Sequence, residues 1–365
     1  ATPLRPPLFP LLLAVTSYPS GIDSDTSLIV AHIGIGALVI AATFLLMAGS
    51  TPPLLCVFAA GFSLYSAKQV GWGIMSEWLG MSLLFLAVTL YLGWTSRPSS
   101  RRALAVSICL SLAMFTRVAF LPWLALPFFI ILQAPRGGRR VTATAVTAGL
   151  VPLLMWSAIN LHRVGTFSIL PHERLNLLAT ARSLGPIPCA SSDTEEQRYL
   201  ITLMNERGTT VSDAGLEPDK VHTWDGEFYG AFHANFNLAT DALYGRENPA
   251  SVRSTALAAR ALSAYTDRYR RFLRGGIHTL LIECMPLVLS CMVVAGWIMR
   301  RDPIQARRAL GVITVCVVSL GYLAAIFGTM LWLRRYFVPI QPILLFCLTI
   351  SVATLLKTFL GPIKN

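Results

Sequence analysis

The chain of 365 residues is 54% hydrophobic and only 13% charged, and its formal net charge is +12. Its mean hydropathy is +0.60. A soluble domain carries about 25% charged residues, so this composition excludes an ordinary pair of water-soluble domains. On a soluble protein such a charge would indicate a nucleic-acid or acidic partner. We expect no nucleic acid here, because the positions of the basic residues explain the charge in another way.

Apolar stretches long enough to cross a bilayer recur along the chain. The clear ones cover 28–48, 73–94, 141–159, 277–299, 309–331 and 336–357, and a shorter one covers 53–67. The stretch 103–133 is too long for one crossing, and Arg117 and Pro122 interrupt it. We expect two short helices there, joined by a tight turn near Arg117. The sequence therefore predicts an all-α polytopic membrane protein with about nine transmembrane helices.

The basic residues test this topology, because they gather in cytoplasmic loops. With nine helices, one side of the membrane receives the loops 95–102 and 134–140, the loop after 299 and the carboxyl-terminal tail, with twelve Lys and Arg residues. Outside the large loop described next, the other side holds only Arg5, Lys68, Arg117, Arg334 and Arg335. The prediction is a plasma (inner) membrane protein whose amino end is extracytoplasmic and whose carboxyl end is cytoplasmic.

One long segment, 160–276, has 13 basic and 13 acidic residues and is neutral. It predicts a globular, mostly helical extracytoplasmic loop, whose last helix is expected to end at Gly275 and Gly276. The predicted domains are an amino-terminal transmembrane bundle of an interfacial segment and six helices (1–159), the loop domain (160–276) and a three-helix transmembrane part (277–365). Cys189 is the one cysteine of the loop, so no disulfide is predicted.

Ionisable groups at membrane depth are costly, so each is a functional candidate. Glu77 lies near the outer end of the helix predicted from 73, and Glu283 is placed similarly after the loop. We interpret Glu283 as a hydrated helix-end residue. Arg5, Lys68 and Arg117 map to the same face as Glu77. Cations beside one carboxylate are typical of a lipid-phosphate site, although arginines at helix ends also reach headgroups without a specific ligand.

Several short segments together resemble the GT-C glycosyltransferases of the protein O-mannosyltransferase and aminoarabinose transferase type (family 39-like). They are Leu4–Leu12 with Arg5 before two prolines, Gly73–Glu77, Phe115–Arg117, Pro152–Asn160 with Gly165, Phe167 and Pro171–Arg174, and Arg335–Tyr336 with Pro339 and Pro342. The resemblance covers about 1–176 and 260 to the end. Each motif is weak alone, and their order and common membrane side make the set more specific.

The resemblance implies transfer of a sugar, with inversion, from a polyprenyl-phosphate donor to a lipid, glycan or protein acceptor in the cell envelope. Glu77 would be a catalytic carboxylate at membrane level. Substrate-binding roles are implied for Arg5, Lys68, Arg117, His172, Glu173, Arg335 and Tyr336. His172 with Glu173 suits a divalent metal ion, but His172 is as readily a solvated loop residue. The sequence leaves the cofactor open.

The sequence departs from the pattern of the GT-C family at the position of its leading catalytic carboxylate. The leading catalytic carboxylate of the family lies in its first outer loop, and the given sequence begins beyond that point. With no initiator Met and no secretory signal, the sequence predicts an amino-terminally truncated enzyme whose leading carboxylate lies upstream. The alternatives are a transporter or flippase and a non-catalytic envelope-assembly protein. A transporter is disfavoured because the sequence has no pair of broken spans at corresponding positions of two halves.

A second polar cluster lies in the loop, where His222, Trp224, Asp225 and Glu227 follow one another closely. The indole face of Trp224 could bind a sugar. We favour a loop that stabilises the fold.

Overall fold

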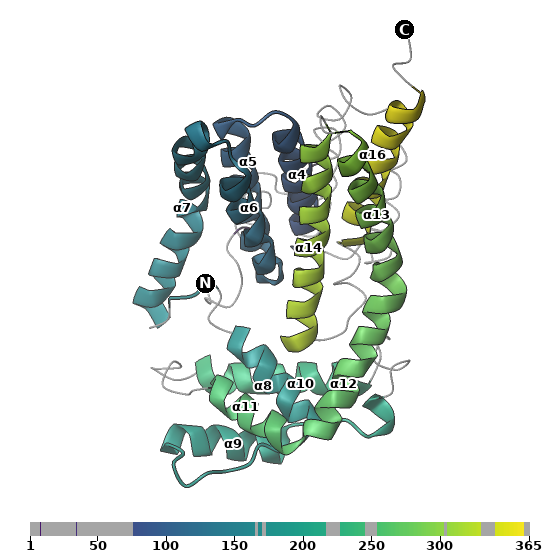
Figure 1. The fold of residues 1–365 in the computed structure, drawn as a ribbon. Coiled ribbons are helices and arrows are strands. Elements are labelled where there is room, and N and C mark those ends of the chain that lie inside the picture. The colour runs from purple at the N-terminus through teal and green to yellow at the C-terminus, as the bar shows by residue number, and fades with distance from the viewer. Residues whose placement is uncertain are drawn as a thin grey trace. The chain divides into compact units, whose positions relative to one another are not determined.

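The computed structural model describes residues 76–164, 167–169, 173–216, 227–244, 254–302, 305–329 and 340–360, with Leu8 and Gly34. Within these residues the protein is all-α, with twelve α-helices and no β-strand (Figure 1). The predicted fold class is confirmed to that extent. The predicted spans 28–48 and 53–67 lie outside the described residues.

The chain divides into two compact units, which we describe separately. The globular unit comprises Ala1–Leu4, Met155–Ile282 and Leu323–Tyr336. The apolar unit comprises Arg5–Leu154, Glu283–Tyr322 and Phe337–Asn365. The three domains expected from the sequence remain a prediction.

The apolar unit is built from helices rich in aliphatic residues, most of them long. They are α4 (Ser76–Ser96), α5 (Ser100–Thr116), α6 (Ala125–Gln133), most of α7 (Arg139–Val164), α13 (Met285–Arg301), most of α14 (Ala306–Thr329) and α16 (Ile340–Leu360). Three described segments are long and apolar enough to cross a membrane: Leu79–Ser96, Arg136–His162 and Ala306–Ile326. Ala119–Gln133 and Ile343–Leu356 are shorter apolar helices.

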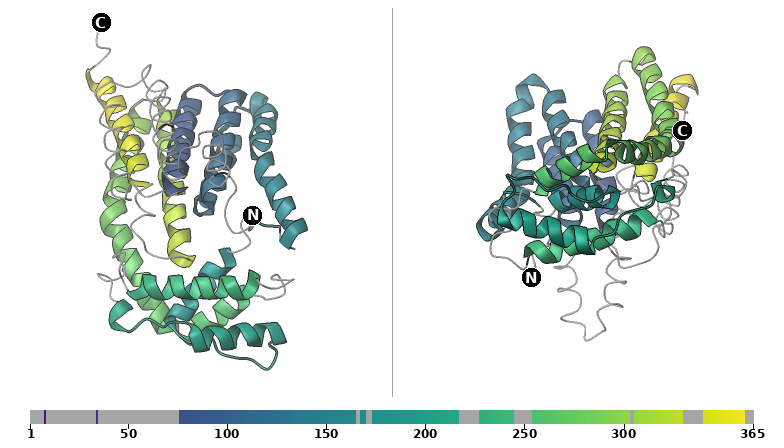
Figure 2. Two further views of the ribbon diagram at one scale, coloured as in Figure 1. Left: turned by 180° about the vertical axis from the view of Figure 1, so that it is seen from behind. Right: turned by 90° about the horizontal axis from the view of Figure 1, so that it is seen from below.

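Short connections and small residues set the packing of the apolar unit. α4 and α5 form an antiparallel pair, and Figures 1 and 2 show them side by side. Ser99 begins α5, and its hydroxyl accepts a hydrogen bond from the Arg102 backbone N–H, which satisfies one unpaired amide of the first turn. α13 and α16 also pack together, and the Cys291 thiol lies 3.3 Å from the Leu344 carbonyl oxygen.

The predicted interruption at Arg117 is confirmed. α5 ends at Thr116, and Arg117 has an extended backbone with φ −157° and ψ 117°. A 3₁₀ helix, η1 (Val118–Leu124), follows and contains Pro122 before α6 begins. Proline has no N–H to donate to the preceding turn, so a regular α-helix through this segment would lose a hydrogen bond.

The globular unit is mostly helical in its described part, as expected for the loop. Its helices are α8 (Glu173–Leu184), α9 (Glu195–Arg207), α10 (Glu227–Tyr244), α11 (Ser254–Ala264) and α12 (Thr266–Thr279). Leucine, isoleucine and alanine side chains of α8, α9, α10 and α11 form one buried core. Burial of this apolar surface is the main stabilising contribution to such a unit.

The predicted helix end at Gly275 and Gly276 is wrong. α12 passes through both glycines to Thr279, and a π-helical turn, η5 (Leu280–Cys284), joins it to α13. A glycine costs a helix only about 1 kcal/mol relative to alanine, which packing of the helix outweighs. The π turn precedes Pro286, whose missing N–H removes a regular helical hydrogen bond.

Candidate functional site

The first turns of α4 pack against the turn at Arg117. A Cβ atom added at Gly80 would collide with the Thr116 hydroxyl and would lie 2.5 Å from Cε2 of Phe120. Glu77 precedes Gly80 by one helical turn, so its backbone lies at the same end of the α4–α5 pair as Arg117. The side chain of Glu77 lies outside the described residues. The structure thus brings together the positions of two residues of the predicted site.

Arg117 is held by backbone hydrogen bonds on both sides. Its N–H donates to the Ala113 carbonyl at 3.0 Å, and its carbonyl accepts from the Phe120 N–H at 3.2 Å. Its side chain is half-buried. After Arg117 in the chain, the rings of Phe120 and Trp123 in η1 pack against the ring of Tyr322 in α14, with centroid distances of 6.0 and 6.4 Å. This aromatic packing holds the 3₁₀ helix that follows Arg117 against α14.

The opposite end of these helices is basic. The Tyr91 hydroxyl donates to Gln133 Oε1 at 3.2 Å, Gln133 Nε2 donates to Thr314 Oγ1 at 3.1 Å, and Arg307 donates to the Gln133 carbonyl at 3.2 Å. These bonds join the last turns of α4 and α6 to the first turns of α14. The basic residues near that end are Arg97, Arg101, Arg102, Arg136, Arg139, Arg140, Arg307 and Arg308. The described basic loops therefore gather at the end opposite Arg117.

Most of the predicted site cannot be placed in this way. Arg5, Lys68, His172, Arg335 and Tyr336 lie outside the described residues. Glu173 is the first residue of α8, and Glu283 lies in the π turn, but neither side chain is among those described. Their proposed roles remain predictions.

The described residues contain no cluster of three His, Cys, Asp or Glu side chains placed to hold a metal ion. The described cysteines are free thiols, and Cys189 is the exposed one among them. A metal site that involves His172 or the side chain of Glu173 would lie outside the part of the chain searched.

Glu227 is the described member of the polar cluster at 222–227. Its carboxylate accepts from the Ser212 N–H at 2.6 Å and from the Ser212 hydroxyl at 2.7 Å. It thereby ties the first turn of α10 to the segment after α9. These contacts fit the fold-stabilising interpretation of Glu227, whereas His222, Trp224 and Asp225 lie outside the described residues.

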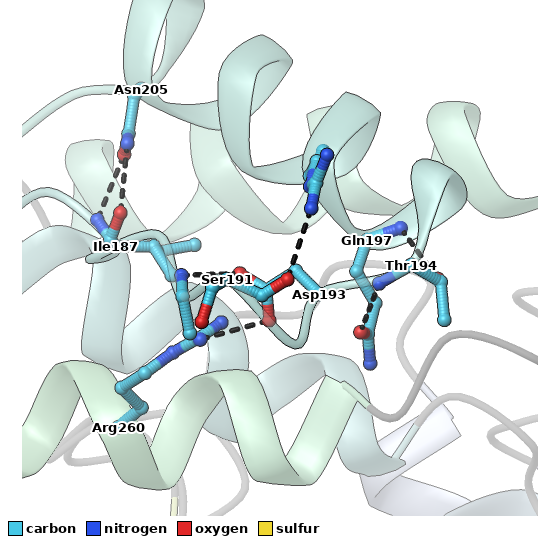
Figure 3. A network of polar contacts seen from close by, with 9 residues as sticks. Ile187, Ser191, Asp193, Thr194, Gln197, Asn205 and Arg260 are labelled. Atoms are coloured by element: carbon cyan, nitrogen blue, oxygen red, sulfur yellow. Dashed lines mark hydrogen bonds and ion pairs between the residues drawn. The ribbon is translucent and has the colours of Figure 1, made fainter.

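A polar network at the start of α9 was not expected from the sequence (Figure 3). The Asp193 carboxylate accepts from Arg260 of α11 at 2.8 Å and from the Ala190 N–H at 2.7 Å, and its side chain is only 6% exposed. Thr194 and Gln197 form a reciprocal capping box. The pattern Thr-x-x-Gln before α9 is the one sequence signal that indicates this site.

The same network closes the loop between α8 and α9. The Asn205 amide donates to the Ile187 carbonyl at 2.9 Å and accepts from the Ile187 N–H at 2.8 Å. Arg198 donates to the Ser191 carbonyl at 3.0 Å. All these partners are backbone groups or structural side chains, so the network orders the loop and supplies no reactive group.

Acid should abolish the contribution of Asp193 to stability. The hydrogen bond from Arg260 is the main cause that holds the pKa of Asp193 below its ordinary value of 3.8. A depressed folded-state pKa means that the stabilisation is present above pH 3.8 and is lost as the pH falls below it. We expect Asp193→Asn to cost about 1 to 3 kcal/mol near neutral pH. In thermal unfolding, the difference between the variant and wild type should shrink as the pH falls below 3.8 and should vanish once the pH lies below the depressed pKa of Asp193. A constant difference from pH 6 to pH 3 would contradict this role.

Comparison of the chain with protein-family models, with curated proteins and with solved structures gives no match in any of the three.

Proposed function

We propose that the chain is an integral membrane glycosyltransferase that moves a sugar from a polyprenyl-phosphate donor to an acceptor on the extracytoplasmic face. The observation that carries the proposal is the position of Glu77 and Arg117 at one end of the α4–α5 pair. The basic loops gather at the other end. Because basic loops mark the cytoplasmic side, Glu77 and Arg117 belong to the extracytoplasmic side.

The proposed topology has about nine transmembrane helices, with the amino end and the large loop extracytoplasmic and the carboxyl end cytoplasmic. Three helices of spanning length and two shorter apolar helices support it. The confirmed break at Arg117 supports it as well, because one long apolar stretch becomes two antiparallel segments there. The proposed location is the plasma (inner) membrane.

The chemistry assigns separate tasks to the cations and the carboxylate. The acceptor hydroxyl loses its proton to the carboxylate that leads catalysis in the GT-C enzymes, and the hydroxyl oxygen attacks C1 of the sugar. The bond from C1 to the lipid phosphate breaks, and its electron pair leaves with the phosphate. Negative charge grows on that phosphate, so a guanidinium held near it, as proposed for Arg117, lowers the barrier. Arg5, Lys68 and Arg335 are the further proposed cations.

Glu77 is proposed to contact the acceptor or a divalent cation at the reacting centre. Tyr336, His172 and Glu173 are proposed to line the donor site. The resemblance to the GT-C enzymes supports these assignments through the motifs quoted above. Arg117 has the most direct structural support among them, because the structure describes its backbone contacts.

The test is sugar transfer in liposomes that contain the purified protein and a labelled polyprenyl-phosphate sugar. We expect Glu77→Gln to lower the rate of transfer by about a hundredfold. Glu283→Gln, which removes the other carboxylate in a predicted span, should change the rate less than threefold, on the order of a surface effect. Equal effects of the two substitutions would remove the role of Glu77.

The same liposomes distinguish the alternatives. Movement of the labelled lipid across the bilayer without any transferred sugar would show a flippase and overturn the proposal. A protein that neither transfers sugar nor moves lipid, with every plausible class of acceptor supplied, would favour the non-catalytic envelope-assembly role.

A further inference from the structure

α12 has two faces that differ in what they contact. Phe272 is buried and stacks on Phe228 of α10 with a centroid distance of 4.8 Å, and Tyr269 lies next to it. The apolar face of α12 is thus covered within the globular unit. The outward face carries Arg270, whose side chain is 67% exposed, and Arg274, one helical turn further.

The four arginines of α12 do not have equal surroundings. Arg271 donates to Asp213 at 2.8 Å, and Arg268 lies 3.7 Å from the same carboxylate. Among the described residues, the carboxylate near Arg270 is that of Asp267 at 3.5 Å, and both side chains are well exposed, so this pair is weak. Arg274 has no ion-pair partner within the described ranges of the chain. A net positive charge therefore remains on the outward face.

The exposed surface changes from basic to mainly apolar after Arg274, with His278 as an exposed polar side chain among the apolar ones. Ile277, Leu281 and Ile282 are 54%, 55% and 61% exposed, respectively. The rise from Arg274 to Ile277 is about 5 Å along the helix. The headgroup layer on one side of a bilayer is of similar thickness, about 5 to 8 Å. Exposed isoleucine and leucine so close to exposed arginine would be unfavourable in water but suit the boundary between headgroups and hydrocarbon.

We propose that Arg270 and Arg274 bind the phosphates of anionic lipid headgroups, while Ile277, Leu281 and Ile282 contact the acyl chains. The bilayer is the partner that matches both chemistries in this order along one helix. The proposal rests on the membrane location in the proposed function but not on sugar transfer.

The test uses the full-length protein in nanodiscs of equal parts phosphatidylglycerol and phosphatidylcholine. Lipids that remain bound after release are identified by native mass spectrometry. Each headgroup-bound arginine contributes about 1 kcal/mol, or roughly a fivefold preference for the anionic lipid. The double variant Arg270→Gln/Arg274→Gln should lose most of the preference of wild type for phosphatidylglycerol. The charge-matched control Arg198→Gln/Arg207→Gln, on α9, should keep it.

A second readout locates the boundary itself. A photoreactive benzoylphenylalanine at Leu281 should crosslink to phospholipid, and the same residue at the exposed His233 of α10 should not. An unchanged lipid preference in the Arg270/Arg274 variant, or no lipid crosslink at 281, would overturn the proposal. Neither measurement needs a sugar donor, so a protein that passes both but transfers no sugar fails only the proposed function.

Discussion

Arg182→Ala is expected to lower the free energy of unfolding of the globular unit by about 3 to 5 kcal/mol, because several hydrogen bonds from a charged group and a buried side chain are lost together. Arg182 is 3% exposed and projects from α8 to the end of α9. Its guanidinium donates to the carbonyl oxygens of Met204 and Gly208, both at 2.8 Å, and also to the Thr210 hydroxyl. Removal of the side chain would take a charged donor from each of these acceptors, and the Met204 carbonyl would keep only the hydrogen bond from the Gly208 N–H at 2.9 Å among those of the described residues.

In the part of the chain that the structure describes, no carboxylate pairs with Arg182, and its location at the carboxyl end of α9 explains why the cation is tolerated there. The last carbonyl groups of a helix have no partner within the helix and carry the negative end of its dipole. Burial lowers the pKa of the Arg182 guanidinium, because loss of water disfavours the charged form. The carbonyl oxygens supply the compensating interaction.

Unfolding of α9 can be followed by hydrogen exchange and by the rate of proteolysis in the globular unit. Domains of this kind have a total stability of about 5 to 15 kcal/mol, so Arg182→Ala should expose α9 to cleavage. Arg207→Ala, at the exposed last residue of the same helix, is the matched control and should behave as wild type. Arg182→Lys should fall between them, because lysine cannot reproduce the planar fork. If α9 is equally well protected from hydrogen exchange and proteolysis in the Arg182→Ala and Arg207→Ala variants, the proposed capping role of Arg182 is wrong.

Gly149→Ala is expected to destabilise the apolar unit by about 1 to 3 kcal/mol, although alanine favours a helix. A Cβ atom at Gly149 would lie 2.5 Å from Cβ of Ser107 and 3.0 Å from the Leu104 carbonyl oxygen. The Ser111 hydroxyl donates to the Gly149 carbonyl at 2.8 Å, so α5 and α7 approach closely at this point. Because a backbone atom is among the obstacles, no change of rotamer can relieve the collision.

The control for this prediction is the same substitution in another helix of the apolar unit. A Cβ atom at Gly296 in α13 meets nothing within 4 Å. Gly296→Ala should therefore be neutral or should stabilise the protein by up to about 1 kcal/mol through helix propensity. The two variants are compared by thermal unfolding in one detergent. An equal or higher unfolding temperature for Gly149→Ala than for Gly296→Ala would show that α5 and α7 do not pack closely there.

Local patterns predict the elements of this protein well where the pattern has a local cause. Aliphatic stretches become α4, α7 and α14, because a helix satisfies its own backbone hydrogen bonds. The break at Arg117 follows from a charge and a nearby proline within one apolar stretch. The capping box before α9 could be found in the same way, because its two partners are three residues apart.

The prediction that the helix ends at Gly275 and Gly276 was wrong because it considered only the low helix propensity of glycine. Gly208 shows a related limit. It ends α9 with φ −77°, so no positive φ requires a glycine there. Space requires it, since a Cβ atom would collide with the Met204 carbonyl oxygen and would lie 2.6 Å from Asn235 Oδ1 and 2.9 Å from Arg182 Nε. Asn235 and Arg182 belong to α10 and α8, and no local pattern shows that these two side chains meet at Gly208.

The sequence by itself determined that the protein is helical, that several helices are long and apolar enough for a membrane, and where basic loops fall along the chain. Only the tertiary structure decided that the described basic loops lie at the same end of the helices of the apolar unit and that the start of α4 packs against the Arg117 turn. It also decided that the side chain of Arg182, from α8, is buried against the carboxyl end of α9. The reason is that hydropathy and helix capping depend on neighbours a few residues apart. The partners of Gly80, Gly149 and Arg182 are more than 20 residues away in the chain, and packing alone selects them.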